Sequence, residues 1–185
     1  RKIAAKLEYL KNKTGCSVFA ITSVAENEGK STCAANIAVS LADRGNKVML
    51  LDLDFKKPAL YKIFGEEEAE NTELTEFLGK KASVSNFAFG QFKKMSLYLA
   101  FLNKSTPFFR NFIADGSIAR MIKEARSEYD FVIIDTAPIS VDSTVTDIIG
   151  MVDKTILIVR TDVVSVNALN DSISTISKIS SNLAG

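Results

Sequence analysis

Short apolar segments alternate with longer segments of helical periodicity along this chain, and that alternation restricts the folds open to it. Buried strands are predicted at 17–22, 47–52, 97–101, 131–135 and 155–160. Helices are predicted over 1–12, 30–43, 59–64, 73–79, 116–127 and 165–180. Continuously apolar strands that alternate with helices are typical of parallel sheets. We therefore expect an α/β fold in which helices flank a mostly parallel sheet on both faces. Its 185 residues suit one domain.

A candidate phosphate-binding loop follows the first predicted strand, where residues 22–32 read TSVAENEGKST. Such a loop needs a strand before it, convergent backbone N–H groups, and a helix N-terminus behind them. Val24 stands where the usual G-x-x-x-x-G-K-[ST] pattern has its first glycine. Asn27 can replace that glycine, because asparagine tolerates positive φ. Taken alone, the G-K-S-T run is also compatible with an ordinary helix start.

The loop residues have separate predicted roles. We expect Lys30 to reach the β- and γ-phosphates of a nucleotide, and the Ser31 hydroxyl to bind Mg²⁺. The side chains of Glu26 and Glu28 are expected to point outward while their amides point inward. The full set predicted to bind the nucleotide is Glu26, Asn27, Glu28, Gly29, Lys30, Ser31 and Thr32.

Carboxylates end two of the predicted strands. Asp52 and Asp54 close the second strand region, and Asp135 closes the strand over 131–135. The carboxyl ends of parallel strands face the crevice in which open α/β sheets bind ligands. A single aspartate there is also compatible with a helix cap. Since Mg²⁺ prefers hard oxygen ligands, we predict Ser31, Asp54 and Asp135 as its ligands.

Composition excludes several other function classes. The chain has no histidine and only two cysteines, which rules out histidine-based catalysis and argues against a zinc site. The net charge of +1 gives no reason to expect a nucleic-acid partner. No apolar run approaches the roughly 20 residues of a membrane span.

Three motifs together resemble the bacterial tyrosine kinases of capsule and exopolysaccharide synthesis, P-loop proteins related to the MinD/ParA ATPases. Their first motif, T-S-x-x-P-G-E-G-K-S-T, is similar to residues 22–32, with Glu26 for proline and Asn27 for glycine. Their D-x-D-x-R motif resembles residues 52–56, where lysine replaces arginine, and their D-T-P-P motif resembles residues 135–138. Ala25 occupies the place of the MinD/ParA signature lysine, which favours the kinase branch.

The resemblance implies an ATP–Mg²⁺-dependent protein-tyrosine autokinase. Lys30, Asp52 and Asp54 would be its catalytic residues, with Asp52 orienting or deprotonating the tyrosine hydroxyl. A membrane activator of the polysaccharide co-polymerase type would be its partner, at the cytoplasmic face of the membrane, and the domain itself would be soluble. The family continues with a further strand and a tyrosine-rich tail, so we expect residues 1–185 to be a fragment lacking both.

Two other functions and the assembly state stay open at this point. A MinD/ParA-like switch would transfer the phosphoryl group to water, and a nucleotide-binding scaffold would regulate a polysaccharide polymerase without catalysis. A homo-oligomer is also left open, because Ala4 stands where the family's N-terminal assembly motif has its second arginine.

Overall fold

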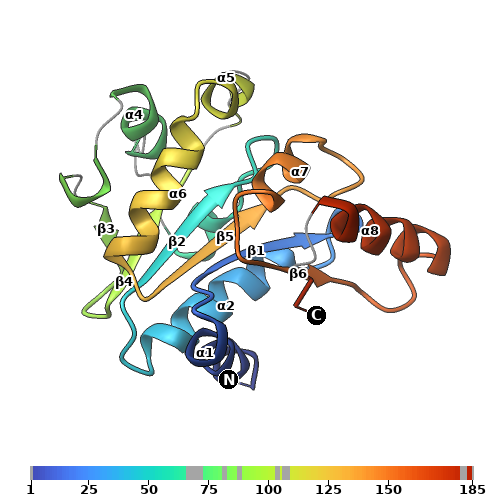
Figure 1. The fold of residues 1–185 in the computed structure, drawn as a ribbon, viewed down its shortest axis with the longest axis horizontal. Coiled ribbons are helices and arrows are strands. Elements are labelled where there is room, and N and C mark those ends of the chain that lie inside the picture. The colour runs from blue at the N-terminus through green and yellow to red at the C-terminus, as the bar shows by residue number, and fades with distance from the viewer. Residues whose placement is uncertain are drawn as a thin grey trace.

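Six strands form one sheet in the order β3-β4-β2-β5-β1-β6 (Figure 1). The structure is a computed structural model that describes residues 2–65, 73–80, 83–86, 89–102, 105, 109–179 and 183–184. The short β3 runs antiparallel to β4, and all other pairings are parallel. The strands are β1 (Val18–Ser23), β2 (Val48–Leu53), β3 (Gly90–Gln91), β4 (Leu97–Ala100), β5 (Phe131–Thr136) and β6 (Lys154–Ile158). The mostly parallel sheet expected from the sequence is confirmed.

Helices connect the strands and cover the sheet. They are α1 (Lys2–Thr14), α2 (Lys30–Ala42), α3 (Leu60–Ile63), α4 (Glu73–Lys80), α5 (Phe109–Ala114), α6 (Ser117–Glu128), α7 (Thr144–Ile149) and α8 (Val166–Ile179), with one 3₁₀ turn, η1 (Val84–Asn86). Every predicted helix and strand is present with its ends within two residues, apart from residues 1 and 180, which lie outside the described residues. The sequence did not predict β3, α5, α7 or η1.

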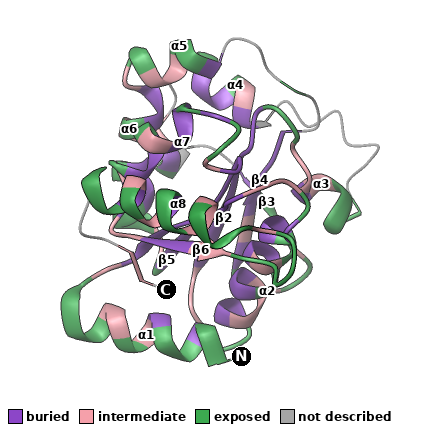
Figure 2. Ribbon diagram, turned by 90° about the vertical axis from the view of Figure 1, so that its right-hand side faces the viewer, coloured by how far each residue is buried: buried purple, intermediate pink, exposed green. Residues whose placement is uncertain are grey.

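Two apolar layers hold the helices to opposite faces of the sheet. Alternate residues of β1 show the division: Phe19 and Ile21 pack with α1 and α2, whereas Val18 and Ala20 pack on the side of α4 and α6. Every residue of β1, β2 and β5 is buried, because helices cover both of their faces (Figure 2). That burial explains why these strands are apolar along nearly their whole length.

The central strands place the polar residues at one end of the sheet. In the parallel register Asp52 on β2 lies directly opposite Asp135 on β5, and Ile21 on β1 lies opposite Asp135 from the other side. The arrowheads of β1, β2 and β5 point toward the side of the molecule where α7 and α8 lie (Figure 1). The loops that leave these three strands therefore meet at a common edge.

Candidate nucleotide site

The loop between β1 and α2 adopts the backbone conformation that a phosphate site needs. Asn27 has φ of 62° and Gly29 has φ of 85°. The prediction that Asn27 takes a positive φ in place of glycine is thus confirmed. With both residues in the left-handed region, the loop turns sharply onto the N-terminus of α2 at Lys30, where unpaired amides and the helix dipole favour an anion.

Lys30 joins this loop to carboxylates at the ends of the two adjacent strands. Its Nζ atom lies 2.6 Å from Asp54 Oδ2, 3.7 Å from Asp135 Oδ1 and 3.2 Å from Ser31 Oγ. The Lys30 side chain is only 10% exposed, and those of Asp54 and Asp135 are 3% and 0% exposed. Four of the predicted site residues therefore form one buried cluster.

Asp52 and Asp54 both bind backbone amides of the turn that follows β2. Asp52 accepts hydrogen bonds from the amides of Asp54, Ala59 and Leu60, each at 3.1 Å. Asp54 Oδ1 accepts one from the Lys57 amide at 3.0 Å. Asp52 thus fixes the start of α3 and the position of Asp54, and it is fully buried.

Burial and neighbouring charges shift the pKa values of this cluster. Burial raises the pKa of Asp135 to about 6, although Lys30 and Ser31 act in the opposite direction. The pKa of Asp52 is raised well above its ordinary range, by burial first and then by Asp135. Burial lowers the pKa of Lys30, but Asp135 and Asp54 raise it by more, so that the lysine stays charged. Strongly perturbed groups of this kind gather at functional sites more often than elsewhere.

The environment of Asp135 fits a divalent cation. Both of its carboxylate oxygens are buried without a hydrogen-bond partner, and the nearest cation, Lys30, lies 3.7 Å from Oδ1; a buried charge that lacks hydrogen bonds is costly. Mg²⁺ keeps several waters and needs only one or two protein ligands beside the phosphates. No group of three or more His, Cys, Asp or Glu residues suited to a metal occurs in the described part of the chain. The oxygens of Ser31, Asp54 and Asp135 are of the kind that Mg²⁺ takes together with phosphates and water, and these residues would hold it.

A cavity of about 660 Å³ opens in front of the loop. Its lining comprises Glu26, Asn27, Gly29, Lys30, Ser31, Thr32, Asp54, Lys56, Lys57, Pro58, Ala59, Lys62, Ile63, Ala137, Pro138 and Val141. Six of the seven residues predicted to bind nucleotide line it. Asp52 and Asp135 lie behind it, and Glu28 is the loop residue that does not reach it.

The predicted orientation of Glu28 was wrong. Its side chain is buried, with 7% exposed. Glu28 Oε2 accepts a hydrogen bond from the Ala25 amide at 2.6 Å, and Oε1 accepts one from the Arg160 amide at 2.9 Å. Glu26, in contrast, lies at the surface as expected, where it pairs with Lys57 at 2.6 Å.

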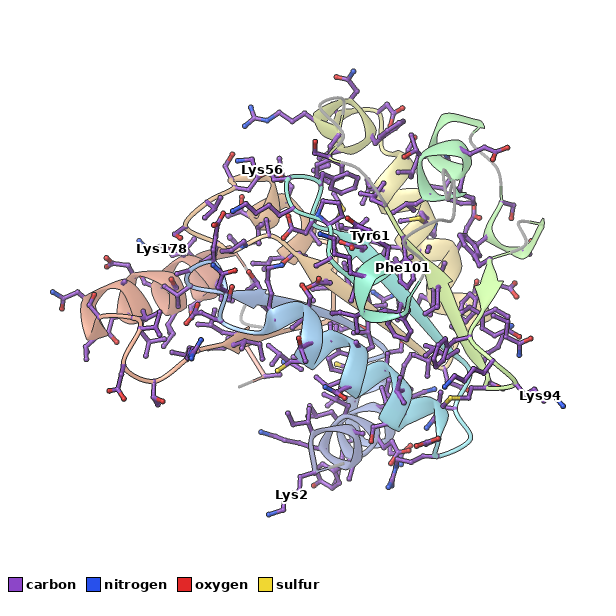
Figure 3. All side chains as sticks on the ribbon, turned by 180° about the vertical axis from the view of Figure 1, so that it is seen from behind. Lys2, Lys56, Tyr61, Lys94, Phe101 and Lys178 are labelled. Atoms are coloured by element: carbon purple, nitrogen blue, oxygen red, sulfur yellow. The ribbon has the colours of Figure 1, made fainter. Side chains whose placement is uncertain are left out.

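Two lysines of the turn after β2, Lys56 and Lys57, line the cavity. Lys56 lies on this turn (Figure 3) and donates to the Val141 carbonyl at 2.9 Å, with the Asp142 carboxylate at 3.4 Å. Lys57 binds Glu26 across the cavity from the loop. The sequence did not predict these contacts, since the partners lie on other loops. Pro58, a turn residue directly after them, was the one local signal.

Comparison with known proteins gives the family. The profile of the AAA domain family matches residues 18–184. The tyrosine-protein kinase YwqD of Bacillus subtilis is 34% identical over 140 residues, which are 75% of this chain and 57% of that protein. The chain belongs to the AAA-domain family, in its bacterial tyrosine-kinase branch. The resemblance inferred from the three motifs is thereby confirmed.

Other relatives of this chain include two kinds of protein. The succinoglycan biosynthesis transport protein ExoP of Rhizobium meliloti is 32% identical over 125 residues, covering 66% of this chain and 16% of that protein. The septum site-determining protein MinD of Helicobacter pylori is 29% identical over 155 residues, which are 84% of this chain and 56% of that protein. The chain thus spans little more than half of YwqD and MinD.

A solved structure has the same fold as this chain. The kinase domain of the Escherichia coli tyrosine kinase ETK superposes with a TM-score of 0.83 at 19% identity, covering 98% of this chain and 70% of that one. The two chains therefore share the arrangement of helices around the sheet. Within the residues described for the present chain, no helix has the length and apolar character to cross a membrane.

Proposed function

We propose that this chain is the ATP–Mg²⁺-dependent domain of a protein-tyrosine autokinase that regulates exopolysaccharide or capsule synthesis and export. The observation that carries the proposal is the position of Lys30. Its ammonium group sits between the phosphate loop and the carboxylates of Asp54 and Asp135. A cation at this place can exchange carboxylates for phosphate oxygens when a nucleotide enters.

Phosphoryl transfer depends mainly on positioning and on neutralisation of charge. Lys30 and the amides of residues 26–32 would hold the β- and γ-phosphates of ATP. Ser31, Asp54 and Asp135 would hold Mg²⁺, which neutralises phosphate charge when it is bound. The 660 Å³ cavity provides space in front of these groups, and the positive φ angles of Asn27 and Gly29 keep the loop open toward it.

Asp52 is proposed as the group that orients or deprotonates the tyrosine hydroxyl. Burial and Asp135 raise the pKa of its carboxyl, and a carboxylate with a raised pKa is a stronger proton acceptor. Its carboxylate accepts three backbone hydrogen bonds behind the cavity, so contact with a substrate requires the turn after β2 to move. Asp54 lines the cavity directly. Its proposed role is to bind Mg²⁺ beside the phosphates.

The partners follow from the same proposal. They are ATP, a tyrosine-bearing segment, and a membrane activator of the polysaccharide co-polymerase type, with the domain working at the cytoplasmic face of the membrane. The similarity to ExoP, a transport protein of succinoglycan biosynthesis, supports a role beside polysaccharide export. Further copies of the chain are proposed as neighbours that present tyrosines to one another. No nucleic-acid partner is proposed.

The similarity to MinD favours one second candidate, an ATPase switch in which water accepts the phosphoryl group. Labelled ATP separates the two. The chain is incubated with γ-labelled ATP, Mg²⁺ and a tyrosine-rich peptide, with and without an activator fragment. Label on tyrosine supports the kinase, label released as phosphate supports the switch, and binding without transfer supports a regulatory scaffold.

Two variants make that experiment specific. Lys30→Met should abolish any transfer, whereas Lys57→Met, at an exposed lysine of the same cavity, should retain most of it. Without added peptide we expect ADP–Mg²⁺ to bind while phosphotyrosine stays near background. Strong autophosphorylation at Tyr9, Tyr61, Tyr98 or Tyr129 would contradict that last expectation.

A further inference from the structure

Glu28 is a buried carboxylate inside the proposed phosphate-binding loop, where a negative charge would repel phosphate. Neither phosphate binding nor metal binding accounts for it. It lies between Asn27 and Gly29, which both line the cavity, but its own side chain turns away from that cavity. Among the described residues, no lysine or arginine forms an ion pair with it. Its charge is instead satisfied by two backbone N–H groups, those of Ala25 and Arg160.

The first of these bonds shapes the loop from within. The Ala25 amide donates to Glu28 Oε2 at 2.6 Å, which closes a ring over residues 25–28. Hydrogen bonds to an ionised carboxylate are about twice as strong as neutral ones. The bond therefore supports the left-handed conformation of Asn27, which lies inside the same ring.

The second bond connects the loop to a distant part of the chain. Arg160 follows the end of β6, which pairs with β1 up to Ser23 and Ile158. Beyond that pair the two chain segments separate, and Glu28 Oε1 joins them again through the Arg160 amide at 2.9 Å. The loop is thus tied to β6 on one side while Lys30 ties it to β2 and β5 on the other.

We propose that Glu28 is the positioning residue of the phosphate loop, holding its amides in register for the nucleotide by binding the Ala25 and Arg160 amides at once. This inference rests on the proposed function, because it treats the loop as a phosphate site. The role belongs to the carboxylate and to two main-chain donors. The side chain of Arg160 takes no part in it.

Affinity for ADP–Mg²⁺, measured by calorimetric titration of the full chain, tests the proposal. Glu28→Ala should weaken binding by about 10- to 100-fold, the scale of losing a hydrogen bond to a charged group. Glu28→Gln should fall between Ala and wild type, since its amide oxygen retains one acceptor. Arg160→Pro, which removes the backbone donor, should weaken binding, whereas Arg160→Ala should not.

Asp153 provides a matched control, because its carboxylate binds backbone amides at the start of β1. Asp153 also accepts hydrogen bonds from two backbone amides, those of Ser17 and Val18, at 2.8 and 2.9 Å, and it pairs in addition with Arg126. Asp153→Asn should lower the melting temperature without changing ADP affinity. ADP binding by Glu28→Ala at wild-type strength, or an equal loss of affinity in Asp153→Asn, would overturn the positioning role.

Amide hydrogen exchange in the nucleotide-free chain separates this inference from the proposed function. The Ala25 and Arg160 amides should exchange at least about 10-fold faster in Glu28→Ala than in wild type, since each loses its acceptor. If wild type bound no ADP, the proposed function would fail, and faster exchange would still support the role of Glu28 in the loop. Unchanged exchange at both amides would refute that role.

Discussion

Replacing Lys30 by methionine should destabilise the protein before any nucleotide is added. The ammonium group lies 2.6 Å from Asp54 and 3.7 Å from Asp135 in a nearly closed environment. At an effective dielectric constant of about 20, the shorter contact alone is worth about 6 kcal/mol of Coulomb attraction, most of which desolvation offsets. Removing one partner of such a buried pair typically costs about 3–5 kcal/mol, because it leaves an uncompensated charge.

That loss is large for a chain of this size. Total stabilities of about 5–15 kcal/mol are usual, and each kilocalorie corresponds to about 2–4 °C in melting temperature at this length. Lys30→Met should therefore melt about 6–20 °C lower than wild type at pH 7. The difference should shrink toward pH 5, because Asp135, whose pKa of about 6 rises further without the lysine, then takes up a proton.

Thermal unfolding followed by circular dichroism measures the shift, and Lys57→Met is the control. Lys57 lines the same cavity, but its side chain is 69% exposed and its pair with Glu26 is at the surface, where ion pairs contribute little. Turnover of any folded Lys30→Met protein should fall by at least about 100-fold, the scale of removing one electrostatic stabiliser. The reasoning is refuted if Lys30→Met has the same melting temperature as Lys57→Met and still binds ADP–Mg²⁺ with wild-type affinity.

Three further perturbations test the rest of the site. Asn27→Gly should leave ADP affinity unchanged or slightly improved, whereas Asn27→Val should reduce it, because a β-branched residue resists the observed φ of 62°. Equal ADP affinities of the two variants would show that position 27 does not need a positive φ. Asp54→Asn should weaken Mg²⁺-dependent ADP binding more than it lowers the melting temperature, and titrations with and without Mg²⁺ would expose a contrary result. ADP binding in the presence of Mg²⁺ should weaken from pH 7 to pH 5, since the pKa of Asp135 is about 6 and a protonated carboxyl is a poor metal ligand; a flat profile would count against Asp135 as a ligand.

The sheet and the main site residues could be predicted because they depend on local patterns. Apolar strands followed by aspartates leave few alternatives in a parallel sheet, since the carboxyl ends must meet at one edge. Asn27 was identifiable because few residues other than glycine accept a positive φ. These are properties of single residues and their immediate neighbours.

The contacts that escaped prediction involve backbone groups and distant segments. Glu28 turns inward because the Arg160 amide, 132 positions away, donates a hydrogen bond to its carboxylate, and a backbone donor cannot be recognised in a sequence. The same holds for Asp52, whose three partners are all main-chain amides. The short elements β3, α5 and α7 have too few residues to show a hydrophobic period.

The register that sets Asp52 opposite Asp135 affects how the free energy of unfolding depends on pH. Burial raises the pKa of both carboxyls, and the charge of Asp135 raises that of Asp52 further, so folding shifts both groups toward the protonated form. At these two positions the folded state therefore binds more protons than the unfolded state between about pH 4 and pH 6, and their contribution to stability decreases as the pH rises through that interval.

At neutral pH the site is thus a local source of instability within the most buried part of the sheet. A neutral residue of the same shape should relieve it: Asp135→Asn should melt at or above the wild-type temperature at pH 7 while losing Mg²⁺-dependent ADP binding. A clear fall in melting temperature would contradict this. The arrangement is a stability–activity trade-off, in which mutation toward a more stable sheet removes the group that a metal would bind.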